Sequence, residues 1–338
     1  MDISESNFTH IKDLNSGMAD IIYVANYTDP FTNEEKKVVY KKVRNTKPIL
    51  ASVKKHSKIS HPNVPKIYGI REMEDKLIIV MEYLNGHNLY DIFNRNPPKD
   101  KYNVYLIAKK ILSVLVKCHK NGLIHNDIKP ENIVIDNDYK LFVIDWDLTL
   151  QNGQKILYPS GTWIYFPPEK VKNDDIEAKT SIDIWCLGCL LYFICTGGND
   201  IIPSNIHGTV AISFFLNHLS DDRISKLIDK NIREKYGDDL AEFIESMLRI
   251  SPEKRPSALD LLKKCIITIR KNENIKQKYD SDILETACIE DNEDLLDILT
   301  LEAKQILIKT ANLVLDRNIG YPEKAKYILN HFKYYPII

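Results

Sequence analysis

Two short apolar runs separated by a polar turn constrain the fold of this chain more tightly than any other feature. Residues 133–135 and 141–144 have the composition of β-strands, and residues 136–138 (Asp-Asn-Asp) favour a turn between them. A hairpin of this length brings its two ends together. We therefore expect Asn132 and Asp145, which flank it, to emerge side by side.

The polar residues around this hairpin have side chains suited to metal and proton chemistry. Asn132 and Asp145 offer oxygen atoms, the hard ligands that magnesium prefers and shares with phosphate groups. Asp127 lies five residues before Asn132, where its carboxylate is placed to accept a proton from an attacking hydroxyl group. Together the three residues predict a site for magnesium and phosphate.

The loop before the hairpin forms an ordered motif. From His125 to Asn132 the chain runs His-Asn-Asp-Ile-Lys-Pro-Glu-Asn, and Asp145 follows thirteen residues after the asparagine. This arrangement resembles the catalytic core of eukaryotic-type serine/threonine protein kinases, of which the chain would be a divergent member. The resemblance implies an α+β fold with a small β-rich N-lobe and a large, mainly helical C-lobe. The alternative is a structural loop whose polar residues cap turns. Motifs elsewhere in the chain distinguish between these two interpretations.

Further segments provide that context in the C-lobe. Residues 160–169 resemble the family's G-T-x-x-Y-x-x-P-E segment, and residues 183–188 resemble its buried central helix. The resemblance implies an ion pair between Glu169 and Arg255 inside the lobe. Apolar residues at helical spacing from Val104 predict an amphipathic helix that leads into the catalytic loop.

Composition and charge limit the class of protein. The chain has 338 residues, of which 44% are hydrophobic and 28% charged, so a large core is expected. A net charge of -1 predicts no bulk attraction to nucleic acid or to an anionic membrane. The first residues lack the basic and apolar regions of a signal peptide, and six scattered cysteines form no disulfide framework. We predict a cytoplasmic protein with reduced thiols.

Two features of the segment 184–195 have simple explanations. Cys186 and Cys189 form a C-x-x-C pair without a second ligand pair at zinc-site spacing, which favours buried thiols in an apolar helix. The segment is apolar almost throughout, but it is too short to span a bilayer.

The first 43 residues predict three strands and a nucleotide-binding turn. Residues 8–14, 21–25 and 37–43 carry strand patterns. The family resemblance places a glycine-rich loop over the ATP phosphates after the first strand, and Gly17 is the glycine of that loop that remains. Asp20 stands at an outer glycine position.

The third strand resembles the family's V-A-I-K strand. This implies that Lys41 contacts the α- and β-phosphates of ATP, with Lys42 as the alternative if the register slips by one. A helix follows at about residues 49–59, and the glutamate that pairs with this lysine in the family is replaced by Ser52. We expect either another acid at Lys41 or a loosely held lysine, and favour the second.

Three acidic residues are candidates for that other acid: Asp145, Glu72 and Glu74. A loosely held lysine would predict slow catalysis and nucleotide affinity that is weak to moderate.

Residues 77–84 resemble the strand and hinge that join the two lobes. The resemblance makes Met81 the residue behind the adenine pocket, and it assigns adenine binding to the backbone of Glu82 and Leu84. It also implies a nucleotide pocket with further contacts from four residues: Ile22, Val39, Asn88 and Val134.

Position by position, the resemblance assigns the chemistry of phosphoryl transfer. Asp127 would be the catalytic base, and Asn132 and Asp145 the ligands of magnesium, with manganese as an alternative metal. Lys41 would bind the phosphates and Lys129 would neutralise the γ-phosphate, and the lysine at position 129 is typical of serine/threonine kinases.

The predicted domains are an N-lobe (1–84), a C-lobe (85–268) and a helical C-terminal extension (269–338). The extension shows helical periodicity without recognisable chemistry, so docking of a partner protein is the role we assign to it. The other expected partners are ATP and a protein substrate.

The predicted function is therefore an ATP- and magnesium-dependent serine/threonine kinase. Asn126 stands where phosphorylation-switched kinases carry an arginine, so we expect no switching by the activation segment. The alternative is a pseudokinase that acts as a binding module, favoured by Ser52, by the depleted glycine loop and by Asp147 at a glycine position. A small-molecule phosphotransferase is a third class that shares the fold.

Overall fold

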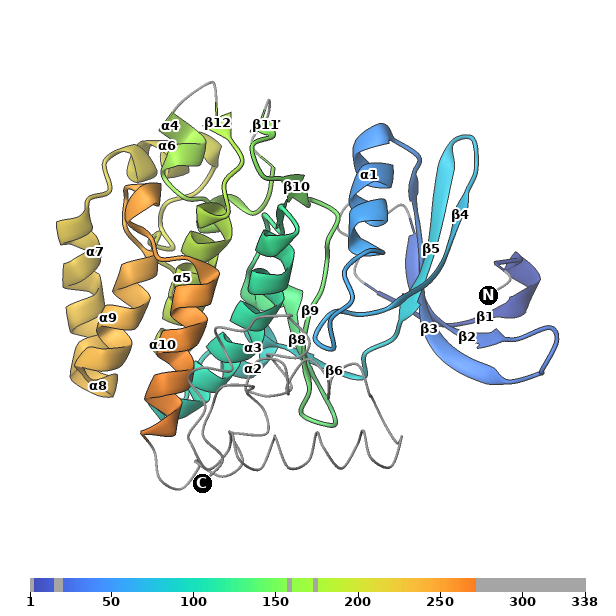
Figure 1. Cartoon of the computed structure of the whole chain (residues 1–338), viewed down its shortest axis with the longest axis horizontal. Coiled ribbons are helices and arrows are strands. Elements are labelled where there is room, and N and C mark those ends of the chain that lie inside the picture. Colours follow the sequence, from blue (N-terminus) through green and yellow to red (C-terminus); the bar gives the residue numbers. More distant parts are fainter. Residues whose placement is uncertain (1–2, 15–20, 157–159, 173–175, 272–338) are drawn as a thin grey trace, which may run out of the picture. The chain divides into compact units, whose positions relative to one another are not determined.

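The computed structural model describes residues 3–14, 21–156, 160–172 and 176–271. The chain divides into two compact units, Met1–Ala258 and Leu259–Ile338. The first unit contains a β-sheet N-lobe and a helical C-lobe (Figure 1), which confirms the predicted bilobal α+β fold. Most of the predicted extension lies outside the described residues, so its helices and the three domain boundaries stay predictions. No helix within the described ranges is long and apolar enough to cross a membrane.

The N-lobe is built on a five-stranded antiparallel sheet with the order β1-β2-β3-β5-β4. Its strands are β1 (Phe8–Asp13), β2 (Ile21–Thr28), β3 (Glu35–Arg44), β4 (Ile67–Glu72) and β5 (Lys76–Glu82). The three strands predicted before residue 44 are confirmed. Sequence patterning did not indicate β4, whose residues lack a clear alternation and whose pairing is interrupted between Ile67 and Gly69.

Alternation along β3 divides the N-lobe core into two layers. Val38 and Tyr40 pack with residues of β2 and β5 on one face of the sheet, which the N-terminal Ile3 helps to cover. Val43 packs on the other face with Val53 of helix α1 (Lys47–His56). Because side chains alternate along a strand, Lys41 lies on the same face as Val43, toward α1.

Helix α1 begins and ends with the signals expected for a short helix. The hydroxyl of Thr46 accepts a hydrogen bond from the N–H of Ile49 at 3.4 Å, and Pro48 occupies the first turn. Lysines at positions 54 and 55 lie in the last turn, where positive charge offsets the exposed carbonyl groups. The helix predicted at about 49–59 is therefore confirmed, two to three residues earlier in the chain. Ser52 is buried on it.

The C-lobe is organised around α5 (Ser181–Thr196), which is buried along nearly its whole length. The predicted amphipathic helix is α3 (Lys101–Lys120), which contacts α5 and the strands of the catalytic loop (Figure 1). The other helices are α2 (Leu89–Phe93), α4 (Glu169–Lys172), α6 (Thr209–Asn217), α7 (Asp221–Ile228), α8 (Glu234–Tyr236), α9 (Asp238–Met247) and α10 (Ala258–Arg270), the last lying almost entirely in the second unit. The short strands are β6 (Gly86–Asn88), β7 (Leu123–Ile124), β8 (Ile133–Asp136), β9 (Leu141–Val143), β10 (Leu150–Gln151), β11 (Lys155–Ile156) and β12 (Ile176–Glu177).

The cysteines of α5 behave as core residues. Cys186 and Cys189 are buried free thiols, and the Cys186 thiol donates to the carbonyl of Tyr165 at 3.3 Å. Burial raises the pKa of both thiols. This confirms the interpretation of the C-x-x-C pair as apolar packing.

An ion pair inside the C-lobe joins the end of the activation segment to the segment before α10. Arg255 donates from Nη1 and Nη2 to the two carboxylate oxygens of Glu169, both at 2.7 Å, as predicted. The Arg255 side chain is 0% exposed and also donates to the carbonyls of Arg249 and Ser181. A third carbonyl, that of Ile250, accepts from Nη2 at 3.3 Å, so removing the side chain would leave a carboxylate and three carbonyl groups without this donor.

We expect Arg255→Met to lower the free energy of unfolding by about 3–5 kcal/mol, the range found when one partner of a buried pair is removed. Urea denaturation of the whole chain measures the loss. Lys226→Met is the matched control, because Lys226 and Asp222 form an exposed pair that contributes little. Equal losses in the two variants would contradict the structural role of the buried pair.

Candidate active site

The predicted hairpin positions the site. Strands β8 and β9 pair antiparallel with Ile133 opposite Val143, and the carboxylate of Asp136 accepts from two N–H groups in the turn, at 2.9 and 2.8 Å. Just beyond the strands, the N–H of Ile144 donates to the carbonyl of Asn132 at 2.9 Å. Asn132 and the residue after Ile144, Asp145, therefore do emerge side by side.

A buried carboxylate of α5 fixes the loop before the hairpin. Asp183 is 0% exposed and accepts from the N–H groups of His125 and Asn126, at 2.9 and 2.8 Å, and from His119 Nε2 at 2.9 Å. Burial alone would raise the pKa of Asp183, but these donors hold it below its usual value. The loop backbone is thus tied to the central helix of the C-lobe.

His125 connects the loop to the segment that follows the hairpin and contains Asp145, the predicted metal ligand. Its Nε2 donates to the carbonyl of Ile144 at 3.0 Å, and its Nδ1 accepts from the N–H of Asp127 at 3.3 Å. These two contacts require the neutral ring with the proton on Nε2. The ring also packs edge-on against Trp146, with centroids 4.5 Å apart, and Trp146 is buried.

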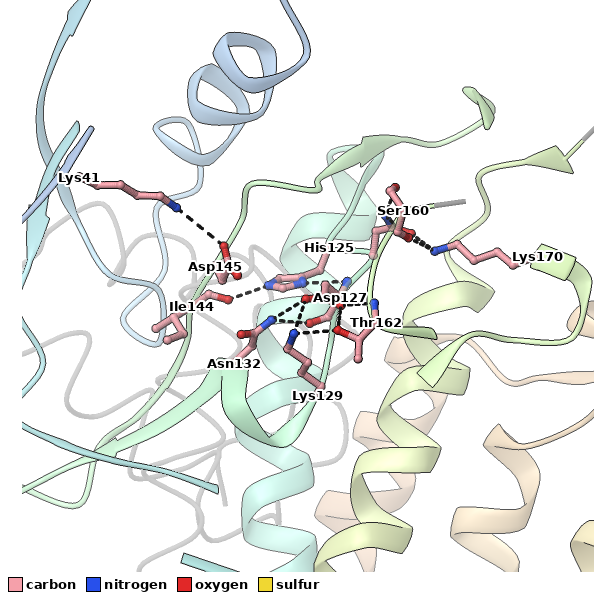
Figure 2. A network of polar contacts seen from close by, with 11 residues as sticks. Lys41, His125, Asp127, Lys129, Asn132, Ile144, Asp145, Ser160, Thr162 and Lys170 are labelled. Atoms are coloured by element: carbon pink, nitrogen blue, oxygen red, sulfur yellow. Dashed lines mark hydrogen bonds and ion pairs between the residues drawn. The ribbon is translucent and has the colours of Figure 1, made fainter. Parts of the chain in front are cut away.

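Asp127 lies at the centre of a network of donors (Figure 2). Its Oδ1 accepts from the N–H and the hydroxyl of Thr162, both at 2.9 Å. Its Oδ2 accepts from Asn132 Nδ2 at 2.9 Å and lies 3.0 Å from Lys129 Nζ. Burial would raise the pKa of Asp127, but Lys129 and Thr162 outweigh it, and the pKa is lowered. The carboxylate is therefore ionised at neutral pH and able to accept a proton.

The glycine before Thr162 permits this contact. Gly161 has φ +115, and a Cβ there would lie 3.0 Å from the carbonyl oxygen of Asn126 and 3.5 Å from Asp127 Oδ1. A side chain at this position would therefore be strained and would press on the loop.

Asn132 and Asp145 form the donor set predicted for magnesium. The amide nitrogen of Asn132 donates to the backbone carbonyl and to Oδ2 of Asp127, at 2.8 and 2.9 Å, which turns its oxygen away from Asp127 (Figure 2). The Asp145 side chain is 42% exposed, and its backbone has φ 62. Such a left-handed conformation is costly for a residue other than glycine and is found most often at functional sites.

These residues fit a magnesium ion that is shared with phosphates. Within the described parts of the chain, no group of three or more His, Cys, Asp or Glu side chains is placed to hold a metal. One carboxylate and one amide oxygen supply part of an octahedral shell, and magnesium commonly completes it with substrate phosphates and water.

Lys41 has a partner that the sequence did not predict. Its Nζ forms a short hydrogen-bonded ion pair with Asp147 Oδ2 and lies 3.9 Å from Asp145 Oδ1. The expectation of a loosely held lysine is therefore wrong. Glu72 and Glu74 are also wrong as candidates, because both are exposed near the turn between β4 and β5, away from the position of Lys41 in the sheet.

The two carboxylates next to Lys41 influence each other. Partial removal from water and the negative charge of Asp147 raise the pKa of Asp145, although part of the side chain reaches solvent, and Lys41 partly offsets the effect. Ser52 contacts a different group: its hydroxyl donates to the carbonyl of Thr149 at 3.5 Å, as does Lys55 Nζ at the same distance.

Several residues predicted for the nucleotide pocket share one face of the N-lobe sheet. Lys41 pairs with Ile22 and Ile79, and Val39 pairs with Met81, and cross-strand partners project to the same side. This is the face that carries α1 and Lys41.

The remaining pocket predictions fall on the hinge and the hairpin. Leu84 makes no backbone hydrogen bond with the other described residues, which leaves its polar groups open to a ligand, whereas the N–H of Glu82 donates to Lys66. Val134 pairs with Asn88, whose amide oxygen caps α2 by accepting from Asp91 at 2.8 Å. Gly17 and Asp20 lie outside the described residues.

A buried lysine supports the activation segment beside Asn126. Lys170 is 1% exposed and donates to Asn126 Oδ1 at 2.5 Å and to the carbonyl of Ser160 at 2.8 Å. The amide nitrogen of Asn126 in turn donates to the carbonyl of Leu148 at 3.2 Å and to the Ser160 hydroxyl at 3.1 Å. Burial lowers the pKa of Lys170. Both ends of the segment are thereby joined to the catalytic loop.

Comparison with known proteins agrees with this geometry. Residues 31–267, more than half of the chain, match the family model described as the protein kinase domain. The chain belongs to the protein kinase family.

Individual kinases are also similar to this chain. The kinase chain is 34% identical over 216 residues to serine/threonine-protein kinase cds1 of Schizosaccharomyces pombe, which covers 60% of this chain and 44% of that protein. It is 26% identical over 217 residues to sperm motility kinase 2B of Mus musculus, covering 64% and 42%, and 29% identical over 208 residues to mouse NUAK family SNF1-like kinase 1, covering 61% and 29%. The chain thus spans less than half the length of these relatives.

Sequence reasoning on this kinase missed three functional contacts. Asp147 was noted as a departure from the glycine of the motif, but its pairing with Lys41 depends on a contact across 106 positions. Lys170 follows Glu169 in a segment where nothing in the local pattern indicates burial of a charge. Thr162 was noticed within its motif, and a threonine directly after a glycine was the signal for its contact with Asp127.

The histidine that stacks on Trp146 makes stability dependent on pH. His56 lies parallel to Trp146, with centroids 5.6 Å apart, and its Nε2 donates to the carbonyl of Pro65 at 3.2 Å. Burial lowers the pKa of His56 from its ordinary value of 6.5 to about 4. Between these values the unfolded chain binds a proton that the folded chain does not, so stability falls as pH falls.

We expect the stability advantage of wild type over His56→Gln to shrink by about 1 kcal/mol between pH 7 and pH 5.5, because only wild type loses this contribution. Urea denaturation at both pH values measures the difference. His61, whose pKa is also lowered, contributes equally to both proteins and cancels. His207→Gln, at an exposed site, is the control, and parallel pH profiles for wild type and His56→Gln would contradict the assignment.

Proposed function

We propose that this protein kinase is an ATP- and magnesium-dependent serine/threonine kinase that transfers the γ-phosphate to hydroxyl groups of proteins. The observation that supports it most directly is the arrangement at Asp127. A hydroxyl group, that of Thr162, already donates to Oδ1 at 2.9 Å, while Lys129 Nζ lies 3.0 Å from Oδ2. An acceptor hydroxyl in a similar position would have its proton taken by Asp127 beside a cation that neutralises the transferred phosphate.

Each of the other residues has a role that follows from its surroundings. Asn132 and Asp145 would hold magnesium, or manganese, which neutralises the phosphate charge that develops during transfer. Lys41 would bind the α- and β-phosphates, and the backbone of Glu82 and Leu84 would bind the adenine edge. Because phosphoryl transfer relies on positioning and charge neutralisation, no covalent role falls to the protein.

The contact between Lys129 and Thr162 supports a preference for serine and threonine. Lys129 Nζ donates to the Thr162 hydroxyl at 2.7 Å, so a lysine, a hydroxyl and the carboxylate of Asp127 meet within one small site. The resemblance associates the lysine at position 129 with serine/threonine kinases. Protein substrates, a cytoplasmic location, the absence of nucleic-acid and membrane partners, and docking by the extension stay predictions.

The alternative of a pseudokinase loses two of its three supports. Asp147 provides Lys41 with a partner, so Ser52 and Asp147 are compensating changes at one ion pair. The expectation of slow catalysis rested on a loosely held lysine, and the rate itself stays a prediction. The glycine-poor loop is the departure that still favours a binding module.

We expect Asp127→Asn to lower the rate of phosphoryl transfer at least tenfold while nucleotide affinity changes little, because the base contacts the acceptor hydroxyl rather than ATP. Transfer of label from γ-labelled ATP with magnesium measures the rate, and calorimetry measures binding. Asp138→Asn, in the exposed turn of the same hairpin, is the matched control. Activity of Asp127→Asn above one tenth of wild type would overturn the assignment.

Contacts of the activation segment bear on how the kinase would be regulated. The contacts among Lys170, Asn126 and Ser160 would keep the activation segment ordered without phosphorylation. Thr149 is buried, and its hydroxyl donates to the carbonyl of Trp146, so it is inaccessible to a modifying enzyme. Tyr158, a further candidate for phosphorylation, lies outside the described residues.

We expect phosphatase treatment to leave the activity unchanged, and Lys170→Met to lower it about 10- to 100-fold, the equivalent of losing a charged hydrogen bond of about 1.5–3 kcal/mol. Lys172→Met, at an exposed position of the same helix, is the control. Thermal denaturation of each variant verifies that it is folded. A kinase that phosphatase inactivates would refute this account of its regulation.

A further inference from the structure

The carboxylate that positions Lys41 comes from an unusual part of the chain. Helix α1, with the sequence KPILASVKKH, contains no acidic residue. Among the described residues, the carboxylates within ion-pair distance of Lys41 Nζ are those of Asp147, in a short contact, and Asp145, at 3.9 Å. Both belong to the segment that follows the hairpin, two positions apart.

The two carboxylates differ in how well they are shielded from water. The side chains of Lys41 and Asp147 are 10% and 17% exposed, whereas that of Asp145 is 42% exposed. A hydrogen-bonded ion pair shielded from water is stronger than an exposed one, so Asp147 is the principal partner of Lys41. Asp145, farther from the lysine and open to solvent, keeps its oxygens available for other ligands.

The backbone next to Asp147 is held in place by contacts of the preceding residue, Trp146. The preceding Trp146 is buried between His125 and His56, and its indole N–H donates to the carbonyl of Val143 at 3.0 Å. The carbonyl of Trp146 accepts from the Thr149 hydroxyl at 2.7 Å. These contacts hold the backbone on either side of Asp147, so its carboxylate is fixed by packing of the segment against the catalytic loop and α1.

We propose that Asp147 is the positioning residue for Lys41, taking the place of a carboxylate on α1. It acts through the lysine, holding the ammonium group beside Asp145, where the phosphates of the nucleotide would lie. This inference rests on the proposed kinase function. The carboxylate that pairs with the lysine comes from the segment after the hairpin, so α1 would influence Lys41 through its contacts with that segment rather than through an acid of its own.

Helix α1 supports the segment that contains Asp147 instead of supplying a carboxylate to Lys41. Its two polar contacts with that segment, from Ser52 and Lys55, both go to the carbonyl of Thr149. Burial lowers the pKa of Lys55. The helix therefore supports the backbone of the segment, and the segment supplies the charge to Lys41.

The first test moves the carboxylate that pairs with Lys41 from position 147 to position 52. We expect Asp147→Asn to lower kcat about 10- to 100-fold while KM for ATP changes less, because an unpaired lysine still attracts phosphate but is poorly oriented. The double variant Ser52→Glu, Asp147→Asn should recover most of the lost kcat, since glutamate on α1 restores a partner. Glu74→Gln, which removes an exposed acid of the N-lobe, is the matched control.

The outcomes separate the possibilities. Loss in Asp147→Asn and recovery in the double variant support the proposal. An unchanged kcat in Asp147→Asn, or a loss that Ser52→Glu does not recover, overturns it. Thermal denaturation of every variant tests whether it is folded. If Asp147→Asn loses kcat because it is unfolded, Asp147 has a structural role, and the proposal is overturned as well.

A second measurement does not need activity. In a double-mutant cycle on stability with Lys41→Met and Asp147→Asn, the two changes should be strongly non-additive, because each one alone leaves the other charge without its partner. If wild type transfers no phosphate although the cycle shows coupling, the kinase function fails while the ion pair stands. Additive effects would instead overturn the pairing itself, whatever the activity.

Discussion

The arrangement of the candidate active site depends on a single buried carboxylate, that of Asp183 on helix α5. A charged group without water is stable only when hydrogen-bond donors surround it, and two of its donors are consecutive N–H groups of the catalytic loop. This requirement holds the loop in a shape in which Asn126 has φ 72, a left-handed conformation. The contacts made by the rest of the loop, including Asp127, follow from that shape.

Two buried lysines are each paired with an oxygen atom from a distant part of the chain. Lys41 and Lys170 both find their oxygen partners near the activation segment: Asp147 for the first, Asn126 and Ser160 for the second. None of these three partners lies on α1. Contacts among the described residues connect the parts of the candidate site, and the segment after the hairpin supplies both the partner of Lys41 and the predicted magnesium ligand Asp145.

Local pattern predicted much of the fold and part of the site. The hairpin, the amphipathic α3, the apolar α5 and the pair of Glu169 with Arg255 follow from periodicity or from motif resemblance, and the structure confirms them. The prediction failed at Lys41. The partner of a lysine depends on which side chains converge in space, and Asp147 lies 106 positions away in the sequence.

By itself, the sequence determined the residue types that can do phosphate chemistry and their order along the chain, because a hairpin of known length places Asn132 beside Asp145 whatever surrounds it. Only the tertiary structure decided which charges pair. Electrostatic interactions depend on distance and on exclusion of water, and both are properties of packing rather than of sequence spacing. For that reason Asp147 appeared from the sequence to be a defect of the motif, and in the folded chain it is the partner of Lys41.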